Sequence, residues 1–597
     1  MAKIFNDDIH NADFLDRYLE HLAGASNLLQ VDDSDTKETL NGTWSFMEDV
    51  FSTSLRAGWF QQTWQTDAAT QNAEKPQDWD YEGMRAMAVP SVWNLAEPQL
   101  YYYEGAAIYT RSFSYQAKQK GERVFLHFEG IATRATVILN NQVVGTHFGA
   151  STPFSCEITA TVQADNRLFV VVDASRPREG VPCDNFDWFN YGGIYRDVYL
   201  VRRPQSFIRS WNIALAKDPG FNRIMFSAEV ADLRSDVSLQ LEIPELGVSE
   251  VVDCVSGKAA ASLEVEPHLW SPDDPYLYEV SVTLIEQGKA LHSCHEKIGF
   301  RDIRVEQGEI LLNGKKIILK GICVHEDDDT LGKTTNEGLV RTTIRDIKDM
   351  NGNYARLAHY PHSRLFARIA DEMGLLLWEE LPVYWGIDFA NPKTFKDAEN
   401  QLAELIARDA NRASVIIWSV GNENADAPER LDFMARLAHT ARIMDSTRLI
   451  SAACLIDPEK LLMTDPLVDE LDVLGINEYY GWYDPDVTKV KTLLDNSAPS
   501  KPVIMTEFGA CAVNGFHASH DVLFTEERQE WIFRRQVEVF AQCPYIKGYS
   551  PWLLYDFRSP RRLNHFQAHY NRKGLIASDK KTRKKAFSVM ADYYKNL

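Results

Sequence analysis

The second half of the chain alternates short apolar runs with segments of helical periodicity. Each run is too short for a free-standing helix and is apolar throughout, as in a strand buried on both faces of a parallel sheet. The expected strands are Ile317–Ile322, Asn353–Leu357, Leu375–Trp378, Val415–Trp418, Leu449–Ala453, Val473–Ile476, Val503–Met505 and Ile546–Ser550. Eight strand–helix units between residues 306 and 597 predict a (β/α)8 TIM barrel.

The first half of the chain has a different pattern, in which short segments of alternating apolar and polar residues are separated by turn residues. Over residues 1–205 this pattern predicts a jelly-roll β-sandwich, and over residues 206–305 a second, immunoglobulin-like β-sandwich. A short helix is expected at Ala12–Leu22. The expected architecture is therefore two β-sandwiches followed by a C-terminal barrel.

Two barrel strands end in carboxylates. Val415–Trp418 runs into Glu423, and Val503–Met505 runs into Glu507. The carboxyl ends of barrel strands meet at one face, where such enzymes place their chemistry. A carboxyl pair across a cleft is what glycoside hydrolysis requires, because one acid protonates the leaving oxygen while the other attacks or activates water. The alternative for Glu423 alone is a cap on the following helix.

Other strand ends are also rich in polar groups, which predicts a shared pocket. They contribute His325, Glu326 and Asp327; Arg356 and His359; Glu379 and Glu380; Asn477 to Tyr480; and Trp552 with Asp556. His325, Glu326, Asp327 and His359 could instead be metal ligands, but their spacing matches no standard zinc or calcium pattern. No metal or organic cofactor is expected.

Charge and cysteine content limit the classes of binding partner and the cellular compartment that the sequence predicts. With 63 basic and 85 acidic residues the net charge is −22, which disfavours binding to nucleic acid or anionic membranes. An anionic substrate must then be met by a few specific cations. The eight cysteines form no CxxC pair and are expected as free thiols. Without a recognisable signal peptide or long apolar run, the expected location is the cytoplasm. A homo-oligomer is left open.

Several long motifs, in order, resemble glycoside hydrolase family 2. They are LNGTWSF (40–46), VPSVWN (89–94), FNYGGIYRDV (189–198), GFRDIRV (299–305), NYARLAHYP (353–361), DEMGLLLWEE (371–380), DANRASVIIWSVGNEN (409–424) and KPVIMTEFGA (501–510). Within the family, HED (325–327), NEYYGWY (477–483), TEFGACAVNGFH (506–517) and YNRKG (570–574) resemble the bacterial β-glucuronidases most.

The resemblance implies a retaining exo-β-glycosidase that cleaves terminal β-D-glucuronides. It implies Glu507 as nucleophile and Glu423 as acid/base, with Arg356 and Tyr479 orienting Glu507. The residues it implies around the sugar are Asp187, His325, Asn422, Tyr479, Tyr483, Trp552, Asn571 and Lys573. Asn422 is expected on the 2-hydroxyl, and Asn571 with Lys573 on the sugar carboxylate; the alternative for Lys573 is a solvated basic tail.

The chain also departs from that likeness. An Arg is expected four residues before Asn571, but Gln567 stands there, while RSPRR (558–562) adds positive charge near the mouth. The loop after Trp385 is short, which favours an open site that accepts oligosaccharide ends. The rivals are β-galacturonidase, β-galactosidase or β-mannosidase of the same family, and a carbohydrate-binding protein on an inactive barrel.

Overall fold

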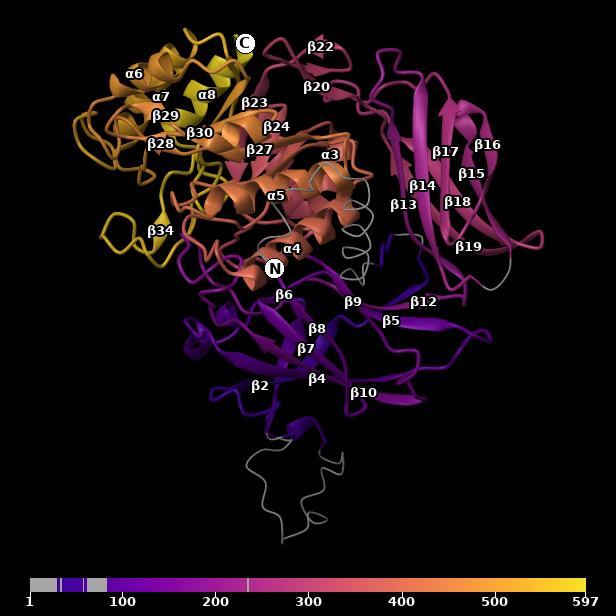
Figure 1. Ribbon diagram of the computed structural model, residues 1–597. Coiled ribbons are helices and arrows are strands. Elements are labelled where there is room, and N and C mark those ends of the chain that lie inside the picture. The colour runs from indigo at the N-terminus through magenta and orange to yellow at the C-terminus, as the bar shows by residue number, and fades with distance from the viewer. Residues whose placement is uncertain (1–28, 33–34, 57, 62–82, 234–235) are drawn as a thin grey trace.

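The computed structural model describes residues 29–32, 35–56, 58–61, 83–233 and 236–597. The helix expected at 12–22 lies outside them. The chain folds into a β-sandwich at the N-terminal end, a second β-sandwich and a C-terminal barrel (Figure 1). Both sandwiches contact the barrel. The predicted fold class is confirmed.

The N-terminal sandwich packs two antiparallel sheets on one apolar core that contains Trp44, Trp93 and Tyr109. One sheet has the order β3-β2-β4-β10-β7-β8 and the other β1-β12-β5-β9. Their strands are β1 Lys37–Thr39, β2 Gly42–Asp49, β3 Arg85–Val89, β4 Ala106–Ser114, β5 Arg123–Phe128, β7 Arg134–Leu139, β8 Gln142–Phe148, β9 Phe154–Glu157, β10 Asp165–Asp173 and β12 Val198–Arg203. A short pair, β6 Ile131–Ala132 and β11 Gly193–Ile194, lies beside them.

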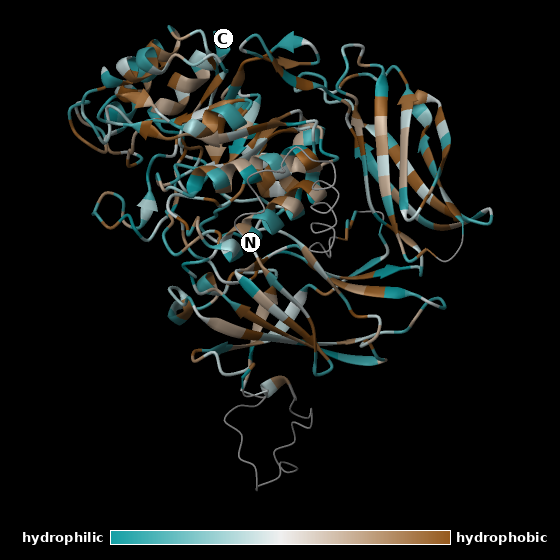
Figure 2. Ribbon diagram, in the orientation of Figure 1, coloured by the Kyte–Doolittle hydropathy of each residue, from teal (hydrophilic) through white to brown (hydrophobic). Residues whose placement is uncertain are grey.

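The second sandwich pairs a three-stranded sheet with a four-stranded one. Its strands, in sheet order, are β13 Phe207–Leu215, β14 Arg223–Ala231 and β17 Lys258–Glu264, then β16 Val248–Asp253, β15 Val237–Ile243, β18 Tyr278–Glu286 and β19 Lys289–Ile298. Burial along β14 alternates residue by residue, and hydrophobic and hydrophilic bands alternate along these strands (Figure 2). Period-two burial is the physical basis of the pattern seen in the sequence. A small sheet of β20 Ile303–Glu306, β21 Glu309–Leu312 and β22 Lys315–Lys316 leads into the barrel.

All eight expected barrel strands form, in the expected order, and the barrel closes where β23 pairs with β32. They are β23 Leu319–Val324, β24 Tyr354–Leu357, β25 Leu376–Glu380, β26 Val415–Asn422, β27 Leu449–Ala453, β30 Leu474–Asn477, β31 Val503–Glu507 and β32 Ile546–Tyr549. The helices outside are α2 Glu337–Asp349, α3 Arg364–Met373, α4 Pro392–Asp409, α5 Arg430–Met444, α6 Lys489–Ser497, α7 Glu526–Phe540 and α8 Lys585–Lys595.

Strands β26 and β31 run further than their apolar residues predicted. Pairing continues to Asn422 opposite Ala453 and to Glu507 opposite Asn477. The apolar run marks only the part of the strand inside the core, and the ladder extends into the polar mouth. The catalytic candidates are therefore carried by, or directly follow, regular strand.

Candidate active site

Glu507 ends β31 and is buried, with both carboxylate oxygens engaged. Arg356 Nη1 donates to Oε1 at 2.9 Å, and the Tyr479 hydroxyl donates to Oε2 at 2.6 Å. Arg356 comes from β24, and Tyr479 follows β30. Three strands thus fix one carboxylate, which suits a nucleophile that must attack along one direction.

Arg356 is completely buried and links three side chains. Besides Glu507, it donates to both oxygens of Glu380, at 2.9 and 3.1 Å, and to the Asn422 side-chain oxygen at 2.7 Å. His359 Nδ1 lies 2.8 Å from Glu380 Oε1. Burial of Glu380 opposes its ionisation but is more than offset by Arg356 and His359, so the pKa of Glu380 falls to about 2. In the sequence, Glu380 stood out only as one more polar strand end.

Glu423 directly follows β26 with a φ of +46°, a conformation that non-glycine residues rarely adopt and that often marks functional positions. The preceding turn is tightly packed, because a Cβ on Gly421 would lie 3.0 Å from the Val383 carbonyl oxygen. Trp385 Nε1 donates to Glu423 Oε2 at 3.0 Å. No feature of the sequence singled out Trp385 for this contact.

The pKa of Glu423 is raised, first by burial and then by the negative charge of Glu507. Hydrogen bonds from Trp385 and Asn477 oppose the shift. This environment favours the protonated carboxyl that an acid catalyst needs, as expected from the sequence. The two carboxyls differ in their surroundings, since Glu507 is paired with Arg356 whereas Glu423 receives only neutral donors.

Asn422 keeps a free donor at the site. Its side-chain oxygen accepts from Arg356 and, at 3.1 Å, from Asn477 Nδ2. Its own buried Nδ2 has no hydrogen-bond partner in the described part of the chain. A buried amide group left open in this way is suited to a substrate hydroxyl.

Lys573 is buried, which overturns the alternative of a solvated basic tail. Its Nζ lies 2.7 Å from the Tyr483 hydroxyl and faces the rings of Tyr479 and Tyr483 at 4.9 and 4.7 Å. Asn571, also buried, accepts from the Lys573 backbone N–H at 3.2 Å. Although burial opposes it, Cys511 and Tyr483 hold the pKa of Lys573 above its ordinary value, so the ammonium is charged.

Asp187, on a loop of the jelly roll, reaches the barrel. It forms a close ion pair with Arg562 and accepts from the Ser559 hydroxyl at 2.6 Å. Arg562 Nη1 also lies 3.3 Å from the Tyr483 hydroxyl, so that Arg562 and Lys573 approach the same oxygen. The sequence showed Arg562 only as one of several basic residues, because nothing local marks which arginine turns inward.

Gln567 does not take the place expected for an arginine. Its side chain is buried and accepts from Asn564 Nδ2 at 2.7 Å, within its own loop. Arg562, five positions earlier, supplies the second cation near Lys573. A second cation therefore approaches the Tyr483 hydroxyl beside Lys573, although none stands at position 567.

His325 and Trp552 form an aromatic wall with neighbouring rings. His325 stacks on Phe557 at 4.1 Å and meets Trp552 edge-on at 5.2 Å, while Trp552 stacks on His359 at 4.7 Å. Burial and the nearby His359 lower the pKa of His325 well below its ordinary value, so the ring is neutral. Its buried Nε2 has no partner among the described residues and remains open to a ligand.

The metal-ligand alternative receives no support from the arrangement of these groups. Glu326 pairs with Arg196 at 2.8 Å, and Asp327 accepts from the Tyr191 hydroxyl at 2.6 Å. Across the described ranges, no group of three or more His, Cys, Asp or Glu side chains is arranged to hold a metal ion. No helix in the same ranges is long and apolar enough to cross a membrane, and all eight cysteines are free thiols.

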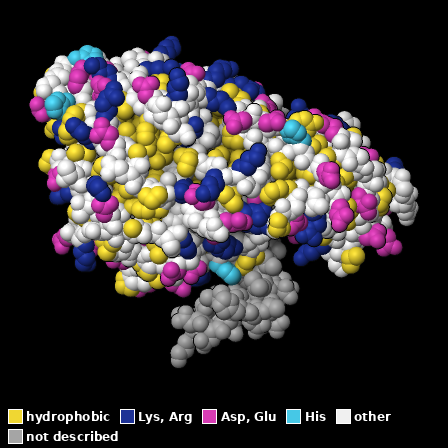
Figure 3. All heavy atoms as spheres, turned by 90° about the horizontal axis from the view of Figure 1, so that it is seen from above, with side chains coloured by type: hydrophobic (Ala, Val, Ile, Leu, Met, Phe, Trp, Pro, Cys, Tyr) yellow, Lys and Arg dark blue, Asp and Glu magenta, His cyan; other side chains and the backbone are white. Residues whose placement is uncertain are grey.

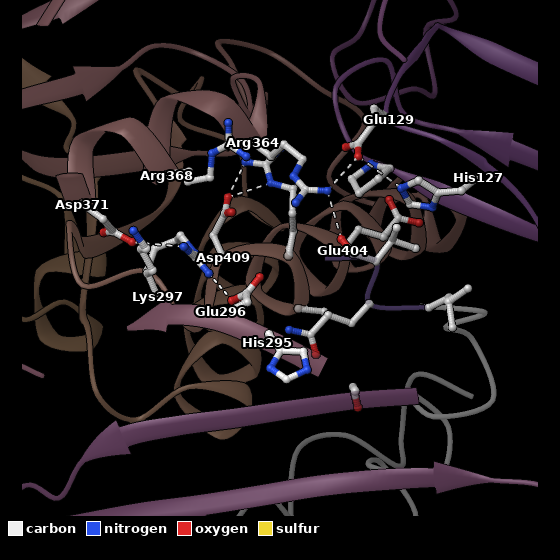
Figure 4. A pocket seen from close by; sticks show the side chains of 18 of the residues that line it. His127, Glu129, His295, Glu296, Lys297, Arg364, Arg368, Asp371, Glu404 and Asp409 are labelled. Atoms are coloured by element: carbon white, nitrogen blue, oxygen red, sulfur yellow. Dashed lines mark hydrogen bonds and ion pairs between the residues drawn. The ribbon is translucent and has the colours of Figure 1, made fainter. Parts of the chain in front are cut away.

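A separate cavity of about 350 Å³ lies where the three domains meet, away from the two carboxyls. Charged side chains from all three domains point toward it, among them Glu129, Glu296 and Arg364 (Figure 4). Arg364 pairs with Glu129 at 3.1 Å, and Arg412 pairs with Glu296 and with Asp371. The Arg364–Glu129 and Arg412–Glu296 pairs cross domain boundaries, which identifies the region as an ionic seam between domains.

Family models for glycosyl hydrolases family 2 match almost the whole chain. The sugar-binding domain matches residues 37–204, the central domain residues 207–301 and the TIM-barrel domain residues 303–597. The chain belongs to glycosyl hydrolase family 2. Its catalytic class is therefore glycoside hydrolysis, the chemistry that the two carboxyls indicated.

Characterised relatives of this family-2 hydrolase include β-glucuronidases. That of Paenibacillus borealis is 29% identical over 569 residues, covering 87% of this chain and 94% of its own. The structure of Bifidobacterium dentium β-glucuronidase with coumarin-3-O-glucuronide has a TM-score of 0.82 at 24% identity, covering 95% and 98% of the two chains. A β-galacturonidase from Eisenbergiella tayi bound to galacturonate has a TM-score of 0.80 at 25% identity, covering 95% and 99%.

Proposed function

We propose that this enzyme is a retaining exo-β-glucuronidase. The observation that carries the proposal is the pair of buried or half-buried cations, Lys573 and Arg562, which approach one oxygen beside the catalytic carboxyls. In a chain of net charge −22, cations at that depth are suited to an anionic sugar. The similarity to β-glucuronidases supports the same glycon.

In the first step, Glu507 attacks the anomeric carbon and forms a covalent glycosyl-enzyme, while Glu423 gives its proton to the departing oxygen. Arg356 and Tyr479 hold the attacking carboxylate in place by hydrogen bonds to its two oxygens. Asn422, with its open amide donor, would bind the 2-hydroxyl, a contact that strengthens in the transition state.

In the second step, Glu423, now ionised, takes a proton from water. The water oxygen attacks the anomeric carbon, and the bond to Glu507 breaks. Two inversions give a product with the configuration of the substrate. Proton NMR of the first-formed sugar tests this directly, because a β-anomer supports retention and an α-anomer contradicts it.

The sugar carboxylate would bind at the oxygen position now occupied by the Tyr483 hydroxyl. Lys573 offers a point charge, Arg562 a planar fork, and Asn571 an amide donor. Asp187, His325 and Trp552 would complete the pocket around the ring. The cations account for binding a uronide in preference to a neutral sugar.

The decisive experiment compares matched chromogenic β-glucuronide, β-galacturonide and β-galactoside. Wild type should favour a uronide, and Lys573→Ala should lower kcat/KM for it at least about 30-fold, from the ~2 kcal/mol or more for an unpaired buried charge. Lys581→Ala, an exposed lysine nearby, is the control. Faster cleavage of the galactoside, unchanged by Lys573→Ala, would disprove the uronide proposal but not the family.

β-Galacturonidase is the second candidate. The TM-score of 0.80 to a β-galacturonidase is close to the 0.79 to one β-glucuronidase, and the two uronides differ only in the orientation of the 4-hydroxyl. Lys573 and Arg562 serve both equally, so the ratio of the two uronide rates decides between them.

A further inference from the structure

Arg561 lies on the rim of the site, next to the acid/base residue. Its guanidinium is 4.7 Å from the centre of the Trp385 ring, and Trp385 donates to Glu423 at 3.0 Å. Tyr384 stacks on the same indole at 4.5 Å. Arg561, Trp385 and Glu423 therefore form one continuous path from the rim to the catalytic carboxyl.

Trp385 is held firmly in that path. Its backbone N–H donates to the Asn422 carbonyl at 3.0 Å, and its own carbonyl accepts from Ala425 N–H at 2.9 Å and from Asn424 Nδ2 at 3.3 Å. The loop that carries Trp385 is thus bound to the turn that carries Glu423. The position of the rim relative to the acid/base residue is fixed by backbone hydrogen bonds.

The three arginines of residues 558–562 have different environments. Arg558 pairs with Asp327 and Asp329 at 3.6 Å, and Arg562 pairs with Asp187. Arg561 is exposed, and its guanidinium donates to the neutral amide oxygen of Asn185 at 2.9 Å. Within the described chain no carboxylate forms an ion pair with it. Arg561 is therefore a cation whose position is fixed and whose charge remains available to an anionic ligand.

The direction of the substrate follows from the site. In the proposed function the sugar ring lies in the interior among Glu507, Asp187 and Lys573, and the leaving oxygen must lie within hydrogen-bond reach of Glu423. The group attached to that oxygen then has to lead out toward solvent, past Trp385 and Arg561. The exposed guanidinium of Arg561 lies beside that exit, over the Trp385 ring.

We propose that Arg561, with Asn185 and Trp385, forms a leaving-group subsite that selects substrates carrying an anionic group close to the scissile bond. The substrate class is a β-uronide whose leaving group carries a negative charge, such as the end of an acidic oligosaccharide. This deepens the proposed function and rests on its assignment of Glu423 to the leaving-group side. Arg561 acts on specificity rather than on bond cleavage.

The test uses two fluorogenic leaving groups of matched shape, neutral 7-hydroxy-4-methylcoumarin and anionic 7-hydroxycoumarin-4-acetate, each attached to glucuronate, galacturonate and galactose. The measured quantity is the ratio of kcat/KM for the acidic over the neutral leaving group. In Arg561→Ala this ratio should fall about 2- to 5-fold from its wild-type value, the scale of an exposed ion pair. The change should lie in KM, since the contact exists before bond cleavage.

Salt and control variants separate the subsite from a general effect. The wild-type ratio should decline toward that of Arg561→Ala between 20 mM and 1 M NaCl, because exposed pairs are screened. Arg561→Lys should keep part of the ratio, and Arg535→Ala, an exposed arginine on the outer helix α7, should leave it unchanged. An equal ratio in wild type and Arg561→Ala at low salt would refute the subsite.

The design distinguishes the two proposals. If only galactosides are cleaved, the uronide assignment fails, and the same pair of leaving groups on galactose still measures the role of Arg561. If uronides are cleaved with no effect of Arg561, the glycon assignment stands and the subsite falls. If no glycoside of the panel is cleaved, both proposals fail.

Discussion

At the residue scale, two glutamates of identical chemistry are suited to the different roles proposed for them because their neighbours differ. Glu507 is fixed by the charged Arg356, while Glu423 is buried beside neutral donors and has a raised pKa. Environments that separate two carboxyls in this way define which is the nucleophile and which is the acid.

Replacement of each glutamate should therefore give a different kinetic pattern. Glu423→Gln should lower kcat/KM about 10²- to 10⁴-fold for a glycoside with a poor leaving group, and much less for one with an activated leaving group that needs no proton. Glu507→Gln should abolish turnover of both. Equal losses with both leaving groups in Glu423→Gln would contradict its role as acid, and full activity of Glu507→Gln would support a binding protein instead.

The Trp385 hydrogen bond predicts a shift in the pH profile. The bond stabilises the ionised form of Glu423 and lowers its pKa, so Trp385→Phe should raise that pKa. Because Glu423 must be protonated to act, the alkaline limb of kcat/KM should move to higher pH. Trp531→Phe on α7 is a control. A shift to lower pH, or none, would show that Glu423 does not set this limb.

At the element scale, the end of β30 contains a buried acid that takes no part in the proposed chemistry. Glu478 accepts from Gln536 Nε2 at 3.0 Å and from the Tyr480 backbone N–H at 2.9 Å. Burial raises its pKa to about 8. The contact with Gln536 joins the strand end that carries Asn477 and Tyr479 to helix α7.

Glu478 should make stability depend on pH. Between about 4.5 and about 8 the folded state holds a proton that the unfolded chain has released, so the free energy of unfolding falls as pH rises through this window. Glu478→Gln is neutral throughout. The free energy of unfolding of the variant should therefore increase relative to that of wild type by up to ~1.4 kcal/mol for each pH unit inside the window. The measurement is the thermal midpoint of both proteins from pH 5 to pH 9, where that of the variant should rise relative to that of wild type. A constant difference between the two proteins would rule out this titration.

Loop 558–571 supplies a cation to the site from a position other than the one expected from the sequence. Strands β33 Phe557–Arg558 and β34 Tyr570–Asn571 pair at its base. Between them the chain brings Arg562 to Asp187 and to the Tyr483 hydroxyl, whereas the Gln567 side chain accepts from Asn564 of the same loop. The loop is thus the element that sets both the sugar pocket and, through Arg561, the rim.

At the scale of the whole molecule, the site is completed only when the jelly roll lies against the barrel. Asp187 crosses to Arg562, and Arg196 crosses to Glu326 and to the Pro361 carbonyl at 2.8 and 3.0 Å. On the face of the molecule seen from above Figure 1, acidic and basic side chains are interspersed (Figure 3). The negative net charge therefore coexists with local positive groups.

Arg196 offers a test of this domain contact. Burial opposes ionisation of Glu326, but Arg196 lowers its pKa, so Arg196→Ala would leave a buried carboxylate without its cation. The expected cost is about 3–5 kcal/mol, measured as a lower thermal midpoint together with a raised KM. Arg341→Ala, which removes solvent-screened pairs with Glu337 and Glu372, should lower the thermal midpoint far less. Similar losses in both variants would mean that the domain contact does not depend on this pair.

The fold and the two carboxyls could be predicted from the sequence because their signals are local. Short apolar runs mark buried strands, and the residues that follow each run must lie at the barrel mouth, which places Glu423, Glu507, Arg356 and Asn422 near one another. Strand ends were less predictable, since pairing in β26 and β31 continues beyond the apolar residues that reveal it.

The sequence by itself thus determined the architecture and the excess of negative charge, and it singled out the carboxyl pair proposed as catalytic. Only the tertiary structure decided which side chains surround that pair. Trp385 meets Glu423 because two loops are joined by hydrogen bonds. Arg562 and Lys573 both reach the Tyr483 hydroxyl because a loop and a second domain converge. Contacts between residues far apart in sequence depend on how loops fold and domains pack, and no pattern of neighbouring residues records them.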